Sequence, residues 1–469
     1  MLYALTGLVL AWLLNPTDFG LVGAVMIFQA FAWLLIDSGF SFALIQRKNP
    51  SRLDYSSVLW FNLAAASVLY LILYICAPLI ADCFDGDRRL VALSRVMFIT
   101  IVTNASAIVQ ANRLIKQMNP RPLAMANLAG LVAGAAVGIW LAFAGYGPWA
   151  IVWQSIAISV VKSVFLWTTG GWLPLMRFSW RSLRSFFAVG GSMMFTAFLN
   201  TLFQNIYSFV IGNRIGLAPL GYFTQANKWS KMAIVSISQT LTSSLLPPLS
   251  QVQDDNERFK RLSLRMARLT AYISAPVFIG LIVMASPVFH LLFGDKWDAS
   301  IILFQLLLIR GIFTVMTDLY NNFILALGRS RLIVKMEIVR DASALIALAA
   351  TLPFMASESA SHPLLGVEIL LYGQIAAGVA AYAVTLFAAA RAASIPTAVL
   401  FGAGIPYFIL SALIAAAISP MLLLDWHPWA LLAVMSLTAV AAYLIANSMA
   451  GSRIQADALA YLLQRRSGN

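Results

Sequence analysis

The chain has 469 residues, of which 61% are hydrophobic and only 10% are charged, and its mean hydropathy is +0.84. Soluble proteins carry about 25% charged residues, so this composition excludes an ordinary soluble domain and predicts an all-α polytopic membrane protein. The net charge of +13 does not indicate nucleic acid, because the basic residues gather in the loops on one side of the predicted helices and therefore report membrane topology.

Fourteen segments are predicted to cross the membrane, on the rule that a span needs about 20 apolar residues. They fall near 2–14, 18–45, 56–81, 90–112, 122–145, 148–172, 186–212, 218–248, 266–292, 299–327, 332–354, 366–390, 396–423 and 428–449. The first is shorter than a bilayer core. The loops after the even-numbered spans hold most of the Lys and Arg, which predicts a cytoplasmic C-terminus. The tail at 452–469 places Ile454, Ala458, Tyr461 and Leu462 on one face, as expected of a cytoplasmic amphipathic helix on the membrane surface.

The two halves of the chain resemble each other at their turns. APLIADCFDGD at 77–87 matches SPVFHLLFGDK at 286–296, and NPTDFGLVGA at 15–24 matches GLAPLGYFTQA at 216–226. These matches predict two six-helix lobes of the same orientation, as in transporters with parallel repeats. We expect an N-terminal lobe at 1–172, a C-terminal lobe at 186–392 and two extra helices at 396–449.

Polar side chains form stripes on the two spans that meet near residues 216–221. The first span carries Asn200 and Gln204 at i and i+4, with Asn205 beside them, and the second carries Gln225, Lys228, Lys231 and Gln239. Polar groups within a membrane are costly and usually face a bundle interior or a water-filled cavity. The stripes therefore predict that these two helices line a hydrophilic cavity.

Six of the basic residues that fall within predicted spans are of interest: Arg95, Lys162, Lys228, Lys231, Arg310 and Arg340. Arg310 lies deepest and either pairs with an acid on a neighbouring helix or contacts a ligand. Lys228 and Lys231 either extend to the interface or hold a phosphate. Lys162 and Arg95 suit structural roles, and Arg340 suits a local ion pair with Glu337 and Asp341.

Two acidic residues are candidates for ion coupling. Asp37 stands alone in the second span, as a proton or cation site or as the partner of a cavity cation, and Asp318 forms a polar cluster with Asn321 and Asn322. Gly130, Gly134 and Gly138 predict a face for close helix packing. The sequence has no phosphate-binding loop, zinc motif or nucleophile elbow. We therefore expect no cofactor, no metal and no enzymatic activity.

Several segments together resemble the polysaccharide-export flippases of the MOP superfamily. They are LAWLLNPTDFGLVGA, DSGFSFALIQ, IGLAPLGYFTQA, LLPPLSQVQDD, LLFGDKWDASIILFQLL and LALGRSRLIVKMEIV. Members often have a basic residue in the first helix, near the place where this chain has Trp12. The resemblance implies two lobes around a central cavity, two extra C-terminal helices, and alternating access in the bacterial inner membrane.

The substrate implied by this resemblance is an oligosaccharide repeat unit on undecaprenyl diphosphate, for exopolysaccharide, O-antigen or capsule synthesis. Lys228, Lys231 and Arg310 would then contact the diphosphate, and Asn200, Gln204, Asn205, Gln225 and Gln239 the sugar. The resemblance also suggests polysaccharide polymerase and export machinery as partners. The alternatives are a drug or metabolite antiporter of the same superfamily, a peptidoglycan-precursor flippase and a membrane glycosyltransferase or polymerase. An antiporter for cations would favour an acidic or aromatic cavity, and an enzyme would favour a sizeable soluble loop.

Overall fold

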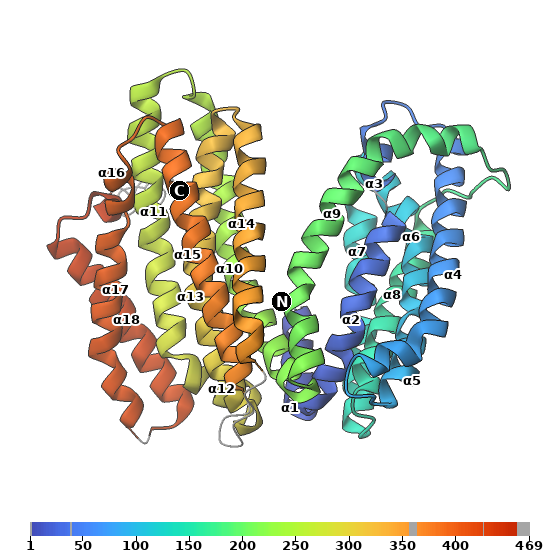
Figure 1. Cartoon of the computed structure of the whole chain (residues 1–469), viewed down its shortest axis with the longest axis horizontal. Coiled ribbons are helices and arrows are strands. Elements are labelled where there is room, and N and C mark those ends of the chain that lie inside the picture. Colours follow the sequence, from blue (N-terminus) through green and yellow to red (C-terminus); the bar gives the residue numbers. More distant parts are fainter. Residues whose placement is uncertain (1, 38–39, 356–363, 425, 457–469) are drawn as a thin grey trace, which may run out of the picture. The chain divides into compact units, whose positions relative to one another are not determined.

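The computed structural model describes residues 2–37, 40–355, 364–424 and 426–456, and these residues form helices and turns without a β-strand (Figure 1). The chain divides into two compact units, Met1–Thr224 and Gln225–Asn469. The helices of the first unit are α1 (Leu2–Leu13), α2 (Pro16–Asp37), α3 (Phe40–Gln46), α4 (Arg52–Asp82), α5 (Arg89–Met97), α6 (Ile99–Lys116), α7 (Arg121–Phe143), α8 (Trp149–Thr169) and α9 (Trp180–Arg214).

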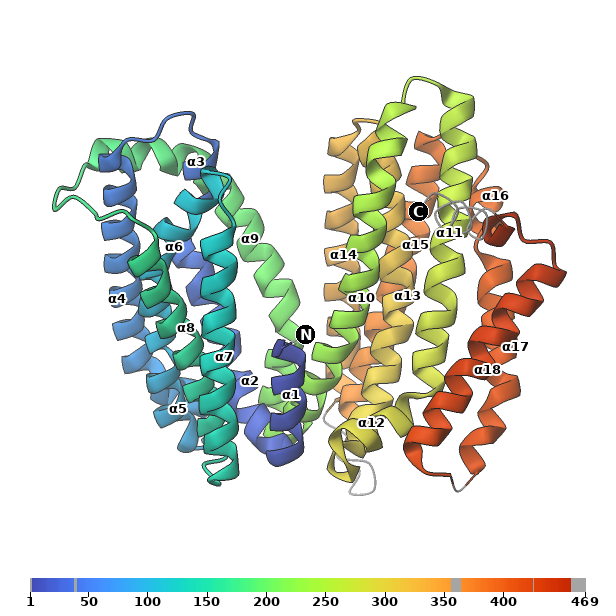
Figure 2. The ribbon, with the colours of Figure 1, turned by 180° about the vertical axis from the view of Figure 1, so that it is seen from behind.

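The second unit takes most of α10 and all later helices, which Figure 2 shows from behind. They are α10 (Leu217–Gln251), α11 (Asn256–Val283), α12 (Ala285–Phe293), α13 (Asp298–Ala326), α14 (Ser330–Thr351), α15 (Leu365–Ala392), α16 (Thr397–Gly402), α17 (Ile405–Ile418) and α18 (Pro428–Met449). Short 3₁₀ turns lie at Asp295–Trp297, Leu352–Phe354 and Ser419–Leu423.

The structure agrees with the sequence that this is a helical protein with membrane-spanning segments. Among the described residues, ten helical segments are long and apolar enough to cross a bilayer. Every predicted span overlaps a helix, but α1, α9, α10 and α14 are not among those ten. The count of fourteen spans therefore remains a prediction. Most of the predicted surface helix lies outside the described residues, which end at residue 456.

Several predicted spans are divided between two helices, and proline explains two of these breaks. The span at 266–292 is divided between α11 and α12, and that at 396–423 between α16 and α17. Pro287 lies in the first turn of α12 and Pro406 in that of α17. Proline has no N–H to donate to the carbonyl four residues earlier, so the helical ladder stops there.

The glycines of α7 form the close packing face that their spacing predicts. A Cβ atom added at Gly130 would lie 2.8 Å from the carbonyl oxygen of Ile158 on α8, and one at Gly134 would lie 2.3 Å from the Ile158 side chain. One at Gly138 would lie 2.9 Å from Cβ of Gln154. Only glycine allows the two backbones to approach this closely, so the prediction of a structural role is confirmed.

Helix α9 packs within the first unit, against α2, α3 and α4. The ring centroids of Phe31 and Phe198 lie 5.7 Å apart, and those of Phe84 and Phe209 lie 5.8 Å apart. This differs from the expected division, which assigned the span at 186–212 to the second lobe. The boundary between the compact units falls instead within α10, so a continuous helix joins them.

The ten residues between α8 and α9 are tied to the first unit along their length. Side chains of α4 and α6 donate to the carbonyl oxygens of this segment, and two serines of α4 accept its N–H groups. The bonds are Arg113–Gly170 at 2.7 Å, Gln110–Trp172 at 2.9 Å, Arg52–Leu173 at 2.9 Å, Trp60–Leu175 at 2.9 Å, Ser56–Leu175 at 2.8 Å and Ser57–Ser179 at 2.9 Å. The linker segment 170–179 is thus an ordered part of the first unit.

Candidate functional site

The first turns of α2 and α10 meet at two glycines. A Cβ atom added at Gly20 would lie 1.8 Å from the carbonyl oxygen of Leu217, and one added at Gly221 would lie 1.8 Å from that of Pro16. The contact is reciprocal, because each glycine faces the residue four places before the other. The two turns are therefore related by a local two-fold axis, and no residue with a side chain fits at either position without displacing the backbone.

Lys228 and Lys231 lie one turn apart on α10, just beyond this crossing. The ammonium of Lys228 lies 5.5 Å from the centre of the Trp229 indole, and that indole packs 5.4 Å from the Phe293 ring. Lys228 is half-buried and Lys231 is exposed. A cation over an aromatic face is attracted by the quadrupole of the ring, so the indole helps to fix the position of Lys228.

Gln225 and Gln239 differ in their surroundings, although both belong to the stripe on α10. Gln225 is 2% exposed, and neither its Nε2 nor its Oε1 has a hydrogen-bond partner among the described residues. Gln239 is exposed. Buried amides without partners are rare because each costs about 1–3 kcal/mol, so Gln225 is an exception among the buried polar groups of α10.

Arg310 lies on α13 and reaches α15. Its Nη1 donates to Oε1 of Gln374 at 2.6 Å, and its stem lies beside Gly378, where an added Cβ would be 3.6 Å from Cγ of Arg310. Gln374 is only 6% exposed. The neighbour that Arg310 contacts on α15 is therefore an amide.

Helices α10 and α13 run parallel and are joined by polar contacts. Ser238 donates to Oδ2 of Asp318, and Asn322 donates to Thr242 at 2.9 Å. Above these bonds, Gly311 faces Ile234, which would lie 2.6 Å from an added Cβ. Since Arg310 precedes Gly311 and Lys231 lies one turn before Ile234, the second unit brings Arg310 and Lys231 to neighbouring levels of adjacent helices.

Arg340 and Asp318, the remaining predicted residues of the second unit, both have polar partners. Arg340 donates to Glu337 at 3.0 Å and to Asp341 at 3.1 Å. This confirms the local ion pair expected for Arg340. Asp318 of α13 is half-buried and accepts a hydrogen bond from Ser238 of α10.

The predicted residues of the first unit are less uniform. Asn200 and Gln204 are exposed on α9, whereas Asn205 donates to the carbonyl oxygen of Thr201 in its own helix at 2.8 Å. Asp37, at the end of α2, accepts from Ser41, whose oxygen in turn accepts from Asn112 at 2.6 Å. A chamber shared with the cations remains a prediction, since these residues belong to one compact unit and the cations to the other.

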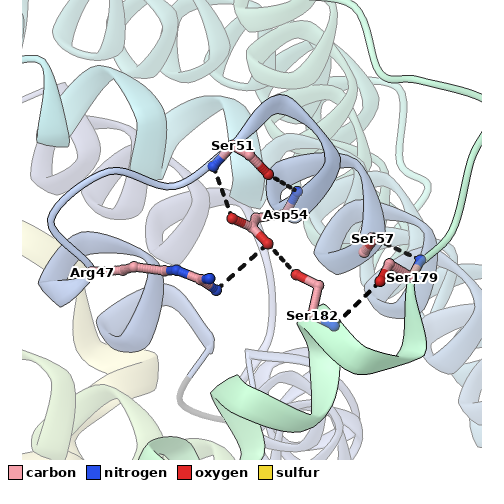
Figure 3. Close-up of polar contacts among 6 residues, drawn as sticks. All are labelled: Arg47, Ser51, Asp54, Ser57, Ser179 and Ser182. Atoms are coloured by element: carbon pink, nitrogen blue, oxygen red, sulfur yellow. Dashed lines mark hydrogen bonds and ion pairs between the residues drawn. The ribbon is translucent and has the colours of Figure 1, made fainter.

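A polar cluster that sequence reasoning missed centres on Asp54, at the start of α4 (Figure 3). The carboxylate accepts from the Ser51 N–H at 2.8 Å and from the Ser182 hydroxyl of α9, and Nη1 of Arg47 lies 3.5 Å away. Ser51 Oγ in turn accepts from the Asp54 N–H at 3.1 Å. Ser51-x-x-Asp54 is a capping box, and that signal was present in the sequence. Asp54 therefore ties the start of α9 to the start of α4.

Replacing Asp54 with alanine is expected to lower the free energy of unfolding by about 2–3 kcal/mol, because one helix cap and one hydrogen bond to a buried carboxylate are lost. Thermal unfolding of the detergent-solubilised protein measures the change. Asp54→Asn should have an intermediate effect, and Asp254→Ala, which removes an exposed carboxylate, should shift the midpoint little. Equal midpoints for Asp54→Ala and Asp254→Ala would contradict the role of the cluster.

Comparisons with known proteins give the family context. The family model described as "Polysaccharide biosynthesis protein" matches residues 9–302. The teichuronic acid biosynthesis protein TuaB of Bacillus subtilis (strain 168) is 26% identical over 304 residues, which is 64% of this chain and 63% of TuaB. The succinoglycan biosynthesis transport protein ExoT of Rhizobium meliloti (strain 1021) is 26% identical over 307 residues, or 65% and 62%. The matches thus span less than two thirds of each relative.

Among solved structures, the chain is similar to a lipid II flippase, MurJ, in an inward closed conformation. The TM-score is 0.70 with 14% sequence identity, over 95% of this chain and 96% of that one. At this identity the likeness concerns the fold alone. The all-helical fold with candidate membrane spans is thus one already seen in a membrane flippase.

Proposed function

Since the chain belongs to the polysaccharide biosynthesis protein family, whose model matches residues 9–302, we propose that it carries lipid-linked oligosaccharide repeat units across the bacterial inner membrane by alternating access. The family match is the observation that carries this proposal. The proposed substrate is an oligosaccharide on undecaprenyl diphosphate, destined for exopolysaccharide, O-antigen or capsule.

The diphosphate sets the main physical demand on such a transporter. Burying an isolated charge in a medium of low dielectric costs far more than any single contact returns, so an anion needs cations along its path. Lys228, Lys231 and Arg310 supply them in the proposal, through charge-assisted hydrogen bonds to phosphate oxygens. Two observations support this assignment: the helices that carry Arg310 and Lys231 are joined by polar contacts, and the partner of Arg310 on α15 is a neutral amide.

The sugar needs neutral donors and acceptors, which the amides of α9 and α10 would supply. Gln225 is the strongest of these, because neither polar atom of its buried amide has a partner among the described residues. Asn200, Gln204 and Gln239 are exposed on their helices. Asn205 is the weakest, since its amide already donates to its own helix.

Asp37 and Asp318 are proposed as ion-coupling residues, in a role that requires a change of protonation or of bound cation. Each accepts a hydrogen bond from a serine, Ser41 and Ser238 respectively. A serine hydroxyl can turn to accept when the carboxyl is protonated, so both sites can serve two charge states. Polysaccharide polymerase and export machinery are the proposed partners.

The direct test is the lipid pool of a strain that lacks the gene. We expect undecaprenyl-diphosphate oligosaccharide to accumulate, measured by mass spectrometry of lipid extracts, with its sugar protected from membrane-impermeant periodate because it faces the cytoplasm. Restoring the gene should return the pool to its normal level. An unchanged lipid pool together with increased sensitivity to cationic drugs would contradict the proposal and favour the antiporter.

A further inference from the structure

A charged hollow lies where α4 ends and α5 begins. It has a volume of about 440 Å³, which is within the roughly 300–1,000 Å³ of small-ligand pockets. Its charged lining consists of Asp82 at the end of α4, Arg88 at the start of α5 and Arg95 two turns further along. Pro78 and Ala81 of α4 also line it. The proposed topology places this end of α4 outside, where basic residues are scarce and so call for a specific reason.

Arg95 is fixed in place by a defect in α4. Pro78 has no N–H, so the carbonyl oxygen of Tyr74, four residues earlier, has no partner in its own helix. Nε of Arg95 donates to that oxygen at 3.3 Å, and the guanidinium lies 4.4 Å from the centre of the Tyr74 ring. An arginine has five N–H donors. The four on its terminal nitrogens have no partner among the described residues, and they lie beside the hollow.

The other two charges are equally available. Among the described residues, neither Asp82 nor Arg88 takes part in a side-chain hydrogen bond or an ion pair, and both are exposed. The neighbouring Arg89 is different, because it donates to Asp87 at 2.7 Å. That bond is the main reason that the pKa of Asp87 lies below its usual value. The hollow thus presents two guanidinium groups and one carboxylate that do not neutralise one another.

Next to the hollow, α4 has apolar side chains that are exposed on the surface of the protein. Leu79 is 63% exposed and Ile75 is 74% exposed. Both lie on the face of α4 that carries Pro78 and Asp82, because residues three, four and seven apart share a side of a helix. A polar hollow of mixed charge next to an exposed apolar stripe is complementary to a phospholipid, which has a charged headgroup and apolar acyl chains.

We infer that this hollow binds the headgroup of an ethanolamine phospholipid, with Arg88 and Arg95 on the phosphate, Asp82 on the primary ammonium and an acyl chain along Leu79 and Ile75. Guanidinium groups suit phosphate geometry. The carboxylate decides the lipid class, because it would repel a purely anionic headgroup and because a primary ammonium can donate hydrogen bonds to it. A choline headgroup has no N–H to donate.

The test measures lipid binding to the purified full-length chain, by native mass spectrometry and by the rise in unfolding temperature on adding phosphatidylethanolamine, phosphatidylcholine or phosphatidylglycerol. We expect about tenfold tighter binding of phosphatidylethanolamine than of phosphatidylcholine, as is usual for one charged hydrogen bond. Asp82→Asn should remove this preference and leave phosphatidylglycerol bound as well or better. Arg88→Gln should weaken all three lipids about tenfold.

Arg88→Gln and Asp82→Asn break no described bond, so both variants should fold, and unfolding temperatures without lipid check this. Arg121→Gln is the matched control, because it removes an exposed arginine at the start of α7, which is not among the residues that line the hollow, and should leave the lipid preference unchanged. Equal binding of the three lipids to the unaltered protein, or an Asp82→Asn variant that keeps the preference, would overturn the inference. Because the readout is binding, its failure is separate from a failure of the transport proposal.

Discussion

Gly20→Ala and Gly221→Ala are each expected to lower the free energy of unfolding by about 3 kcal/mol and to reduce polysaccharide export strongly. The added Cβ would lie 1.8 Å from a backbone carbonyl oxygen in either case. Backbone cannot turn aside as a side chain can, so the first turns of α2 and α10 must separate. Overpacking costs about 1–3 kcal/mol even where side chains can adjust. Thermal unfolding in detergent and polymer output of the complemented strain measure the two effects.

The reciprocal geometry makes a sharper prediction for the double variant. Once one methyl group has pushed the turns apart, the second enters a gap that already exists, so the double variant should be destabilised by much less than the sum of the single effects. Gly280→Ala is the control, because an added Cβ there meets nothing within 4 Å on α11. It should raise stability by up to about 1 kcal/mol, the difference in helix propensity. Additive losses would contradict the reciprocal contact.

Arg310→Ala is expected to reduce export about 10–100-fold while the protein still reaches the membrane. The reason is the loss of a charge-assisted hydrogen bond to phosphate, worth about 1.5–3 kcal/mol, at a position where the guanidinium is held by Gln374 at 2.6 Å. Arg310→Lys should be intermediate, because an ammonium keeps the charge but not the planar fork. Export is measured by polymer output normalised to the amount of protein in the membrane.

Two further variants separate ligand contact from a structural tie between α13 and α15. Gln374→Met keeps the volume and removes the bond, so it should lower the unfolding temperature as Arg310→Ala does but reduce export less. Lys335→Gln, which removes an exposed charge on α14, should leave export unchanged. Equal losses of export in Arg310→Ala and Gln374→Met would show that the bond itself, and not the charge, is what transport needs.

The sequence predicted helix positions well because apolar length is a local property. Every predicted span overlaps a helix. The breaks at Pro287 and Pro406 were readable from the chain, since proline interrupts a helix for a local reason, but they were not predicted. Helix partners were harder. The packing of α9 on α2, α3 and α4 depends on contacts such as Phe31–Phe198 and Ser182–Asp54, which join residues more than a hundred positions apart and leave no periodic signal.

For the candidate site, too, the sequence predicted local features better than contacts between helices. The identity of the intramembrane polar residues was plain from the chain, but their partners were not. A lone glutamine in an apolar span gave no reason to pair Gln374 with Arg310. The role of Pro78 in freeing a carbonyl for Arg95 required knowing that α5 folds back against α4. The matching turns indicated an internal repeat, but they did not predict that Gly20 and Gly221 meet, which needed coordinates.

The ordered segment 170–179 has a consequence for how force passes along the chain. It joins the first eight helices to α9 without slack, since six hydrogen bonds of 2.7–2.9 Å fasten it to α4 and α6. A displacement of α9 is therefore transmitted directly to α4 and α6, because no flexible linker separates them. Inserting a few glycines into segment 170–179 would let α9 move without moving α4 and α6, although the sequence of every helix would stay the same.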